Sequence, residues 1–314
     1  MNDTDTLRAL ESLNARALAL RSSTEYAAGV QRQNLKRLLG DISPRGVRQA
    51  AREFKMFRAF SKAPRHPEQP NLTPEEWEAS LKTGDPHKHV VVYSCIVGAY
   101  DCPLPPLWHA DNISYVLFLE GQDASKVEGW EVRPIPDEVR RASGGSNANI
   151  NRYIKFHPYE LFADDFDASI YIDGNIQPVS DLSYYADRID PLAGIALHYH
   201  RVRDSIADEV QTCKALEKGN AALMDAQVER YVRAGFPLDY GLLECNVIAA
   251  DLASKVGKRI FAAWWDEFLS SGSMRDQLAL PYVLWSLGIP IEAAATMGRN
   301  AYADTKIFIA DHTR

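Results

Sequence analysis

Three polar residues, Asp173, Gly174 and Asn175, directly follow a short apolar run at 169–172. A carboxylate and an amide carbonyl two residues apart can point two oxygens at one cation, and oxygen ligands are what Mg²⁺ and Mn²⁺ prefer in proteins. Asp-Gly and Gly-Asn are also favoured dipeptides of β-turns. These residues alone therefore leave two interpretations open: a plain turn, or a turn that carries Mn²⁺ or Mg²⁺.

A second group of polar residues lies in the segment LHYHRVRDSIADE, residues 197–209. His198 and His200 are two apart and would share one face of a strand, where imidazoles can bind a metal or donate to phosphate. Arg203 follows them and could neutralise phosphate charge. The alternative is an ordinary strand end beside Asp204, which would cap the next helix.

Three further features carry groups that could act on a charged substrate. Arg275, Asp276 and Gln277 precede an amphipathic run, where a helix N-terminus favours anions, although they could equally be a cap. Lys155 could neutralise a diphosphate as a point charge, although most lysines face solvent. Glu244 stands at the start of an apolar strand, where an acid is uncommon.

Apolar runs next to these residues predict strands, and amphipathic runs between them predict helices. The predicted strands cover 89–101, 113–120, 169–173, 194–200, 245–251 and 305–311. The predicted helices cover 204–218, 221–234, 251–270 and 273–287. This alternation is typical of an α/β domain with a mostly parallel sheet. Ligands of such sheets collect beyond the carboxyl ends of the strands, where Asp173, residues 98–101 and residues 198–200 are predicted to lie.

Composition narrows the class of protein. The chain has 314 residues, 46% of them hydrophobic, and a net charge of −7, which argues against general binding of nucleic acid. Its four cysteines form no CxxC pair, so we expect reduced thiols in a cytoplasmic protein. No apolar run approaches the length of a membrane span.

The first 88 residues differ from the rest. Residues 1–62 carry helical periodicity, including a basic amphipathic segment at 47–60 within the basic stretch 31–65. A polar, proline-rich linker follows, with one short helix expected after Thr73-Pro74. We therefore predict a helical N-terminal region and linker over 1–88 and an α/β domain over 89–314. The N-terminal helices could provide peripheral contact with the inner face of a membrane, or an oligomer or partner contact.

Taken together, the motifs resemble a known family. They occur in one order at residues 91–101, 153–162, 168–176, 198–209, 234–237, 241–248, 264–269 and 273–285. In this arrangement the chain resembles the glycosyltransferase-like family first catalogued as a domain of unknown function, which includes plant turgor and seed-mucilage proteins and bacterial polysaccharide-synthesis proteins. The resemblance spans about residues 89–312 and implies a GT-A-type fold that binds a nucleotide-sugar.

The resemblance also implies roles for single residues. Asp173 and Asn175 match the metal motif, with His312 in the place of a histidine that completes the metal shell; a frayed end is the alternative for His312. Asparagine replaces the second aspartate of many GT-A enzymes, which puts strong metal dependence in question. The residues that match the nucleoside-binding turn and the element facing the sugar are Gly98, Tyr100, Asp101, Arg275, Asp276 and Gln277.

The implied activity is transfer of a sugar from a nucleoside diphosphate, UDP being expected, to a hydroxyl of a glycan or lipid-linked acceptor in polysaccharide synthesis. Lys155, His200 and Arg203 would neutralise the diphosphate. For an inverting reaction Asp276 is the first choice of base and Glu244 the second; for a retaining reaction both would position the sugar. A silent module that binds nucleotide-sugar or glycan is the alternative, and no G-x-S-x-G motif supports a lipid hydrolase.

Overall fold

The structure is a computed structural model that describes residues 3–23, 43 and 67–312. The basic segments predicted at 31–65 and 47–60 lie outside the described residues, Ser43 excepted, so their predicted helices and contacts stay predictions. Among the residues described, no helix is both long and apolar enough to cross a membrane.

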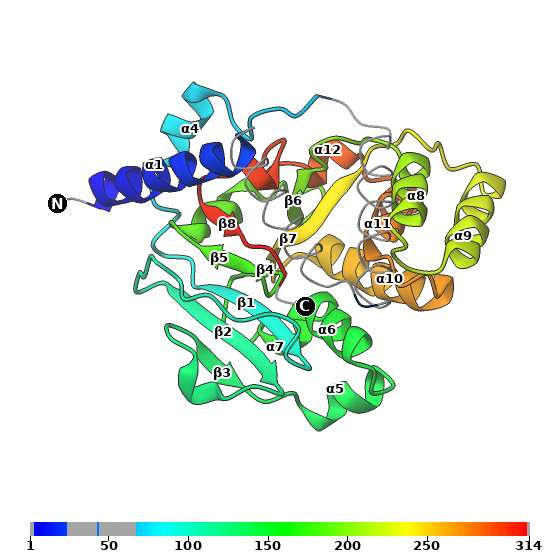
Figure 1. The fold of residues 1–314 in the computed structure, drawn as a ribbon, viewed down its shortest axis with the longest axis horizontal. Coiled ribbons are helices and arrows are strands. Elements are labelled where there is room, and N and C mark those ends of the chain that lie inside the picture. The colour runs from blue at the N-terminus through cyan, green and yellow to red at the C-terminus, as the bar shows by residue number, and fades with distance from the viewer. Residues whose placement is uncertain (1–2, 24–42, 44–66, 313–314) are drawn as a thin grey trace.

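The centre of the molecule is a six-stranded sheet in the order β3-β2-β1-β4-β7-β6 (Figure 1). Its strands are β1 (Val90–Val97), β2 (Ile113–Glu120), β3 (Glu131–Arg133), β4 (Ala168–Ile172), β6 (Ile195–Tyr199) and β7 (Leu243–Asp251). Pairings among β1, β2, β3 and β4 are parallel, and β7 runs antiparallel to both β4 and β6. The predicted α/β fold with a mostly parallel sheet is confirmed. All eight residues of β1 are buried, which explains its continuous apolar sequence.

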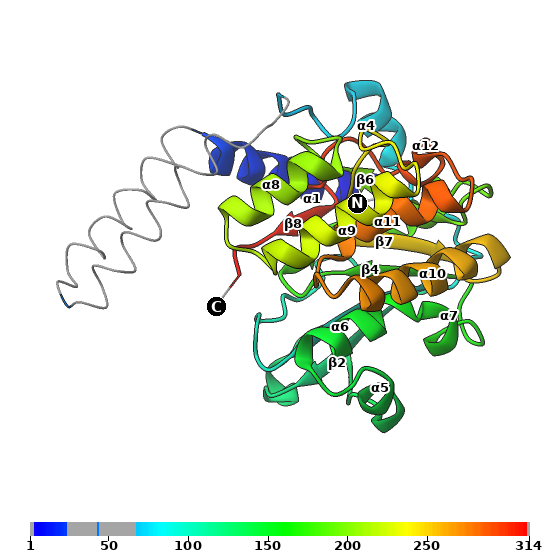
Figure 2. The ribbon, with the colours of Figure 1, turned by 90° about the vertical axis from the view of Figure 1, so that its right-hand side faces the viewer.

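Helices cover both faces of this sheet, and a separate two-stranded sheet lies beside it. They are α1 (Asp3–Ser22), α4 (Pro74–Ser80), α5 (Asp137–Ala142), α6 (Asn147–Phe156), α7 (Pro158–Leu161), α8 (Ile206–Ala215), α9 (Ala221–Arg233), α10 (Lys255–Ser271), α11 (Asp276–Ser286) and α12 (Ile291–Ala294). The turns of 3-10 helix are η1 (Ala124–Lys126), η2 (Leu182–Arg188) and η3 (Ala301–Ala303). The four long helices predicted between strands are all present, shifted by a few residues at their ends. Helices α8 and α9 lie side by side (Figure 2).

Each face of the sheet has its own core. On one face α6, α10 and α11 pack side chains such as Ile154, Trp264 and Leu280 against the strands. On the other face Leu7 of α1 joins residues of β1, β4 and η2. The apolar run predicted as a strand at 305–311 becomes β8 (Ile307–Ile309), which pairs with β5 (Ile176–Pro178) in a separate two-stranded sheet. That run is therefore a strand, but it does not extend the central sheet.

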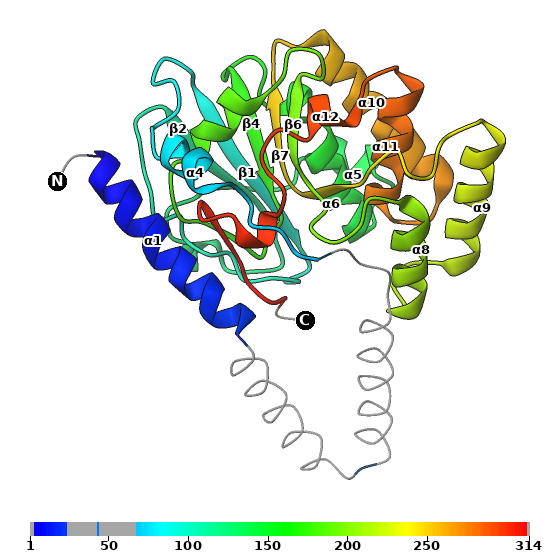
Figure 3. The same ribbon diagram turned by 90° about the horizontal axis from the view of Figure 1, so that it is seen from above.

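Helices α1 and α4 belong to the N-terminal region, and they pack against the C-terminal part of the chain. The predicted cap of α4 is confirmed: Thr73 accepts from the backbone of Glu76, and the Glu76 side chain accepts from the backbone of Thr73. α1 lies beside β8 and η3 (Figure 3). All four cysteines are free thiols, in line with the prediction.

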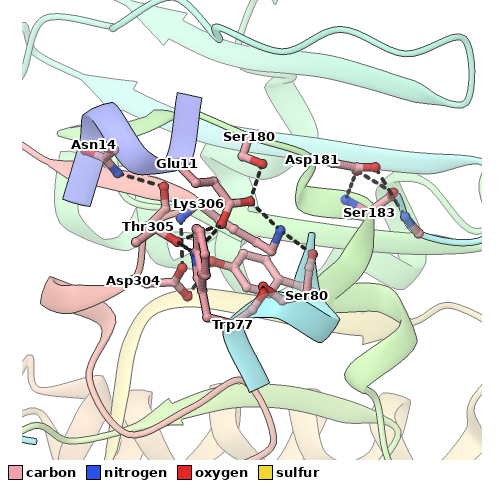
Figure 4. Close-up of polar contacts among 12 residues, drawn as sticks. Glu11, Asn14, Trp77, Ser80, Ser180, Asp181, Ser183, Asp304, Thr305 and Lys306 are labelled. Carbon is pink, nitrogen blue, oxygen red and sulfur yellow. Dashed lines mark hydrogen bonds and ion pairs between the residues drawn. The ribbon is translucent and has the colours of Figure 1, made fainter. Parts of the chain in front are cut away.

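A fully buried ion pair joins α1 to the segment before β8 (Figure 4). The Nζ of Lys306 lies 2.8 Å from Oε1 of Glu11, and it also donates to the carbonyl of Ser80 in α4. The Glu11 carboxylate accepts three more hydrogen bonds, from Ser180, Thr305 and Trp77. A buried charge costs several kcal/mol unless such partners compensate it. The network therefore ties four distant parts of the chain to one point.

We expect Glu11→Ala to lower the free energy of unfolding by about 3–5 kcal/mol, because it leaves the ammonium of Lys306 buried without its counter-charge. Urea unfolding followed by circular dichroism measures this loss. Arg8→Ala is the matched control, since Arg8 lies on the same helix but pairs with Glu78 in solvent, and such pairs contribute about 0–1 kcal/mol. Equal losses in the two variants would contradict the role given to the buried pair.

Candidate active site at the carboxyl end of the sheet

The sheet brings most of the predicted site residues to one end. β1 and β4 are parallel neighbours, so the residues after Val97 and after Ile172 emerge at the same end. β7 is antiparallel to β4, and for that reason its first residues, including Glu244, lie at this end as well. The residues that follow β6, beginning with His200, complete the set: the amide of His200 donates to the carbonyl of Leu242.

Residues Asp173, Gly174 and Asn175 form a turn that links strands of two different sheets. The amide of Ile176 donates to the carbonyl of Asp173 at 3.0 Å, but the strand that follows, β5, pairs with β8 rather than with β4. The turn is therefore not the connection of a β-hairpin. A Cβ on Gly174 would lie 2.6 Å from the side chain of Ile96, so close packing requires glycine here.

The polar side chains of this turn are held in place. The hydroxyl of Tyr171 donates to Oδ1 of Asp173 at 3.0 Å. The amide nitrogen of Asn175 donates to the carbonyl of Ala310 at 2.7 Å. Only the amide oxygen of Asn175 could therefore serve a cation, together with the carboxylate of Asp173.

The turn after β1 packs against the turn after β4. Gly98 has a φ of +73°, and a Cβ there would lie 2.5 Å from the side-chain nitrogen of Asn147 at the start of α6. Asp101 is buried, and both of its carboxylate oxygens lie 3.1 Å from Nδ1 of His312. The ring of Tyr100 is half exposed, with its centroid 5.2 Å from that of His312. Tyr100, Asp101 and His312 therefore form one cluster beside Gly174, whose Cβ position is 3.6 Å from Cβ of Asp101.

Lys155 and Asp276 form a buried ion pair in the middle of the site. Lys155 is 1% exposed, which excludes the interpretation of an ordinary surface lysine, and its Nζ lies 2.5 Å from Oδ2 of Asp276. The Nε of Arg152 lies 3.2 Å from the same oxygen. Two cations thus face one carboxylate. The Nζ of Lys155 also lies 5.1 Å from the ring centroid of Tyr171, whose hydroxyl contacts Asp173.

The surroundings of Asp276 fix its charge. Burial by itself would raise the pKa of this carboxyl, but Arg152 and Lys155 outweigh burial and hold the pKa far below its usual range. The carbonyl of Asp276 accepts from the indole nitrogen of Trp264 at 2.8 Å, which fixes the start of α11 on α10. Asp276 is therefore a permanent carboxylate with little affinity for a proton.

Glu244 has the opposite environment. Burial raises its pKa to about 7, and the charge of Arg201 only partly offsets this. Two neutral groups lie beside the Glu244 carboxyl: Nε2 of His200 and Nε2 of Gln277, each at 3.5 Å. Gln277 also donates to the carbonyl of Leu243 at 2.8 Å, which places its amide beside the carboxyl.

The other cations of the site are partly compensated by one carboxylate. Glu209 contacts Arg203 at 2.7 Å and Arg275 at 3.2 Å.

Burial, together with the charge of Arg203, lowers the pKa of His200 to about 4. At neutral pH His200 is uncharged, so it can exchange hydrogen bonds with a phosphate but adds no positive charge.

The interpretation of His198 and His200 as a pair that shares one ligand is wrong. His198 is fully buried, and its Nε2 lies 2.8 Å from Oδ2 of Asp304 on the face covered by η2. His200 lies beyond the end of β6 and contacts Glu244 and Arg203. The alternation of the strand does not extend to His200, because β6 ends at Tyr199.

A divalent cation fits this site only in part. Within residues 3–23, 43 and 67–312, no three His, Cys, Asp or Glu side chains cluster closely enough to hold a metal. Asp173, the amide oxygen of Asn175 and the nearby carboxylate of Asp101 are hard oxygen ligands. One or two carboxylates are the usual contribution of a protein to Mg²⁺, whose other ligands are phosphate oxygens and water. This donor set suits a cation that enters with a diphosphate, and it offers no complete cage.

Sequence reasoning missed two residues of the site. Arg152 lies three residues before Lys155 on α6, and this spacing places both on one helix face, a signal that was present in the sequence. Glu209 lies in the first turn of α8, where acids are common for helix stability alone. Nothing in the sequence distinguished Glu209 from such an acid.

Comparison with known proteins gives only distant likenesses. No protein-family model matches the chain, and no curated protein matches it. Among solved structures, the bifunctional glycosyltransferase WbbM matches at 10% identity and a TM-score of 0.38, over 64% of this chain and 38% of its own. Mouse xyloside xylosyltransferase 1 matches at 10% identity and a TM-score of 0.38, over 71% of this chain and 97% of its own.

The mannosyltransferase Ktr4p of S. cerevisiae matches at 12% identity and a TM-score of 0.33, over 75% of each chain. All three are glycosyltransferases by name, and this chain spans little more than a third of the length of WbbM. Because all three TM-scores lie at or below 0.38, these similarities assign no role to any residue of this chain.

The raised pKa of Glu244 predicts a pH-dependent stability. The folded state keeps this proton up to about pH 7, whereas the unfolded chain loses it near pH 4.5, so the wild type loses stability as the pH rises between these values. Glu244→Gln carries no such charge. We expect the free energy of unfolding of the variant, relative to the wild type, to rise by about 2–3 kcal/mol from pH 5 to pH 8.

Urea unfolding of both proteins at the two pH values measures this difference. Glu229→Gln is the control, because Glu229 is exposed on α9 and its substitution also removes one carboxylate. A Glu244→Gln difference that stays constant between pH 5 and pH 8 would contradict the environment described for Glu244.

Proposed function

We propose that the chain is a glycosyltransferase that binds a nucleoside diphosphate sugar at the carboxyl end of the sheet. The observation that carries the proposal is the pair of buried carboxyls, Asp276 and Glu244, whose surroundings move their pKa values in opposite directions. In enzyme active sites, two carboxyls with pKa values moved apart in this way commonly divide the work between proton transfer and stabilisation of charge. The GT-A-type fold expected from the family resemblance has its donor site at this place, after a central strand.

The donor would lie across the turns after β1 and β4. Tyr100, which is half exposed, and the turn at Gly98 that carries no side chain suit the nucleoside, UDP being the expected one. Arg152 and Lys155 against the single carboxylate of Asp276 leave one excess positive charge, which suits the diphosphate.

A divalent cation, Mn²⁺ or Mg²⁺, would be held by the carboxylate of Asp173, the amide oxygen of Asn175 and the carboxylate of Asp101. In this structure Asp101 contacts His312. When bound, such an ion supplies Lewis-acid stabilisation of the departing diphosphate. The positively charged side chains of the protein would stabilise the diphosphate as well. They are Arg152 and Lys155 in the centre of the site, and Arg203 and Arg275 beside Glu209.

Glu244 is the better candidate for the base of an inverting transfer, which reverses the order inferred from the sequence. A base must accept a proton near neutral pH, and the pKa of Glu244 lies at about 7. In the transfer the acceptor hydroxyl forms the new bond to the sugar carbon, its proton passes to Glu244, and the bond to the diphosphate breaks with its electrons. Asp276 instead fixes Arg152 and Lys155. In a retaining transfer both carboxylates would position the sugar.

The acceptor would be a glycan or a lipid-linked sugar, approaching from the side of Glu244. Arg201 and Tyr302 border this side: the guanidinium lies 4.1 Å from the ring centroid of Tyr302, and Tyr302 is 39% exposed. An exposed aromatic ring beside a cation is a surface that a sugar ring can contact. No role for nucleic acid follows from the acidic chain.

A silent module that binds nucleotide-sugar without turnover is the second candidate. It is favoured by Asn175 in the metal motif and by the compensation of Arg203 and Arg275 by Glu209. An enzyme hydrolyses its donor slowly with water as acceptor, whereas a silent module leaves the donor intact.

We expect UDP to bind the wild type in the presence of Mn²⁺ and to bind Asp173→Ala at least about tenfold more weakly, a difference of about 1.4 kcal/mol. Calorimetric titration with Mn²⁺ and with excess chelator measures both. Asp111→Ala is the control, because Asp111 is an exposed aspartate just before β2, at the opposite end of the sheet. Equal affinity with and without metal would remove the cation from the site, and absence of UDP binding would overturn the proposed donor.

We expect Glu244→Gln to slow hydrolysis of a UDP-sugar by about 100-fold or more while UDP still binds, because general bases contribute about 10²–10⁴ to rate. The wild-type rate should rise with pH and level off above about 7. Turnover is measured as UDP release from UDP-glucose, UDP-galactose and UDP-N-acetylglucosamine. A Glu244→Gln variant as fast as the wild type would exclude Glu244 as the base, and no UDP release from any of the three would favour the silent module.

A further inference from the structure

The segment 304–312 runs from the buried centre of the N-terminal contact to the candidate donor site. At its inner end Lys306 is fixed by Glu11 in the core. At its outer end Ala310 exchanges two hydrogen bonds with Asn175: its amide donates to the Asn175 carbonyl at 2.9 Å, and its carbonyl accepts from the Asn175 side chain at 2.7 Å. His312 then contacts Asp101. One segment therefore connects two regions that the sequence separates widely.

Helix α1 holds this segment along its length. Asn14 donates to the carbonyls of Thr305 and Ile307, both at 2.8 Å. Arg21 lies about two helical turns further along α1. It donates to the carbonyl of Ile309 at 2.5 Å and to the carboxylate of Asp311 at 2.9 Å. Its guanidinium also lies over the ring of Phe308, 5.0 Å from the centroid. The last turn of α1 thus binds the residues on either side of Ala310, which touches the donor site (Figure 3).

The strength of these contacts falls from the inner to the outer end. The Glu11–Lys306 pair is fully buried, whereas the side chains of Asp311 and His312 are 89% and 50% exposed. Phe308 and Ile309 are also held by the pairing of β8 with β5. Exposed contacts contribute little each, so the position of residues 310–312 rests on few groups. Arg21 contacts three residues of this segment, Phe308, Ile309 and Asp311.

We propose that Arg21 is a positioning residue for the donor site. It acts through residues 308–312: by holding Ile309 and Asp311 it seats Ala310 on Asn175 and His312 on Asp101, so that the turn after β4 keeps the shape that receives the nucleoside diphosphate. This inference rests on the proposed function. It assigns a role in donor binding to a helix outside the segment that carries the family resemblance.

The test compares UDP affinity, with Mn²⁺ present, in the full-length wild type, Arg21→Ala, Arg21→Lys and Arg16→Ala. If only about a fifth of Arg21→Ala molecules keep the segment seated, the apparent affinity falls about fivefold. Arg21→Lys keeps the charge but offers one donor group in place of the fork, and we expect it to recover part of the loss. Arg16→Ala is the matched control, since Arg16 is an exposed arginine of the same helix, and its affinity should equal that of the wild type.

Hydrogen exchange supplies a readout that does not depend on UDP. We expect the amide of Ala310 to exchange faster in Arg21→Ala than in Arg16→Ala, because its bond to Asn175 opens more often. Unchanged exchange at Ala310 overturns the inference whatever the affinity. A lower melting temperature with wild-type UDP affinity shows a purely structural role and also overturns it.

The same experiment separates the inference from the proposed function. UDP binding by the wild type that is lost in Asp173→Ala but kept in Arg21→Ala overturns the role of Arg21 and leaves the donor site standing. Absence of UDP binding in the wild type overturns the proposed donor and, with it, the role of Arg21.

Discussion

A buried carboxylate needs a cation beside it, and this constraint organises the molecule. Glu11 meets Lys306 in the core, Asp276 meets Lys155 and Arg152 in the site, and Glu209 meets Arg203 and Arg275. Removing one partner of such a pair costs about 3–5 kcal/mol, so each pair fixes the elements that supply it. Glu244 differs from these three: it lies 3.5 Å from the neutral ring of His200, the charges of Arg201 and Arg203 only partly offset its burial, and its pKa rises to about 7.

The distribution of these charges bears on mechanism. Cations already bound to protein carboxylates are preorganised: they do not have to leave water or change conformation when a diphosphate arrives. Their attraction for the ligand is reduced by the same carboxylates, which sets a limit on affinity. A site of this kind suits a transferase that must release its nucleotide after each turnover, and it equally suits a module that binds nucleotide-sugar reversibly.

The sequence allowed the α/β class to be predicted, along with its strands, its long helices and the end of the sheet where polar residues gather. Those features depend on local periodicity and on strand direction, which neighbouring residues determine. The opposite environments of Asp276 and Glu244 could not be predicted. They depend on Arg152 and Lys155, more than a hundred residues from Asp276, and on the burial of Glu244, which Arg201 and Arg203 offset only in part.

The same limit applies to His198 and to the run around Ile307, which was correctly predicted as a strand but without its partner strand. An alternating pattern predicts one shared face, but β6 ends at Tyr199, so His200 lies outside the strand and no longer follows its alternation. An apolar run of β-branched residues predicts a strand, but it contains no information on which sheet the strand joins. Ile307 pairs with Pro178 because α1 and the Glu11–Lys306 pair hold it there.

The antiparallel direction of β7 has a consequence for how this site could change over evolution. In a parallel strand, new residues added at the carboxyl end lengthen a loop over the site and leave the strand itself unchanged. In β7 the site is built from the first residues of the strand, so an insertion of one residue after Glu244 would shift it out of phase with the pleat. The inserted residue would take the place of Glu244 in the strand, and the carboxyl would turn to the opposite face of the sheet. The chemistry of this site is therefore tied to strand register, and substitution of side chains is an easier route to new specificity than a change in loop length.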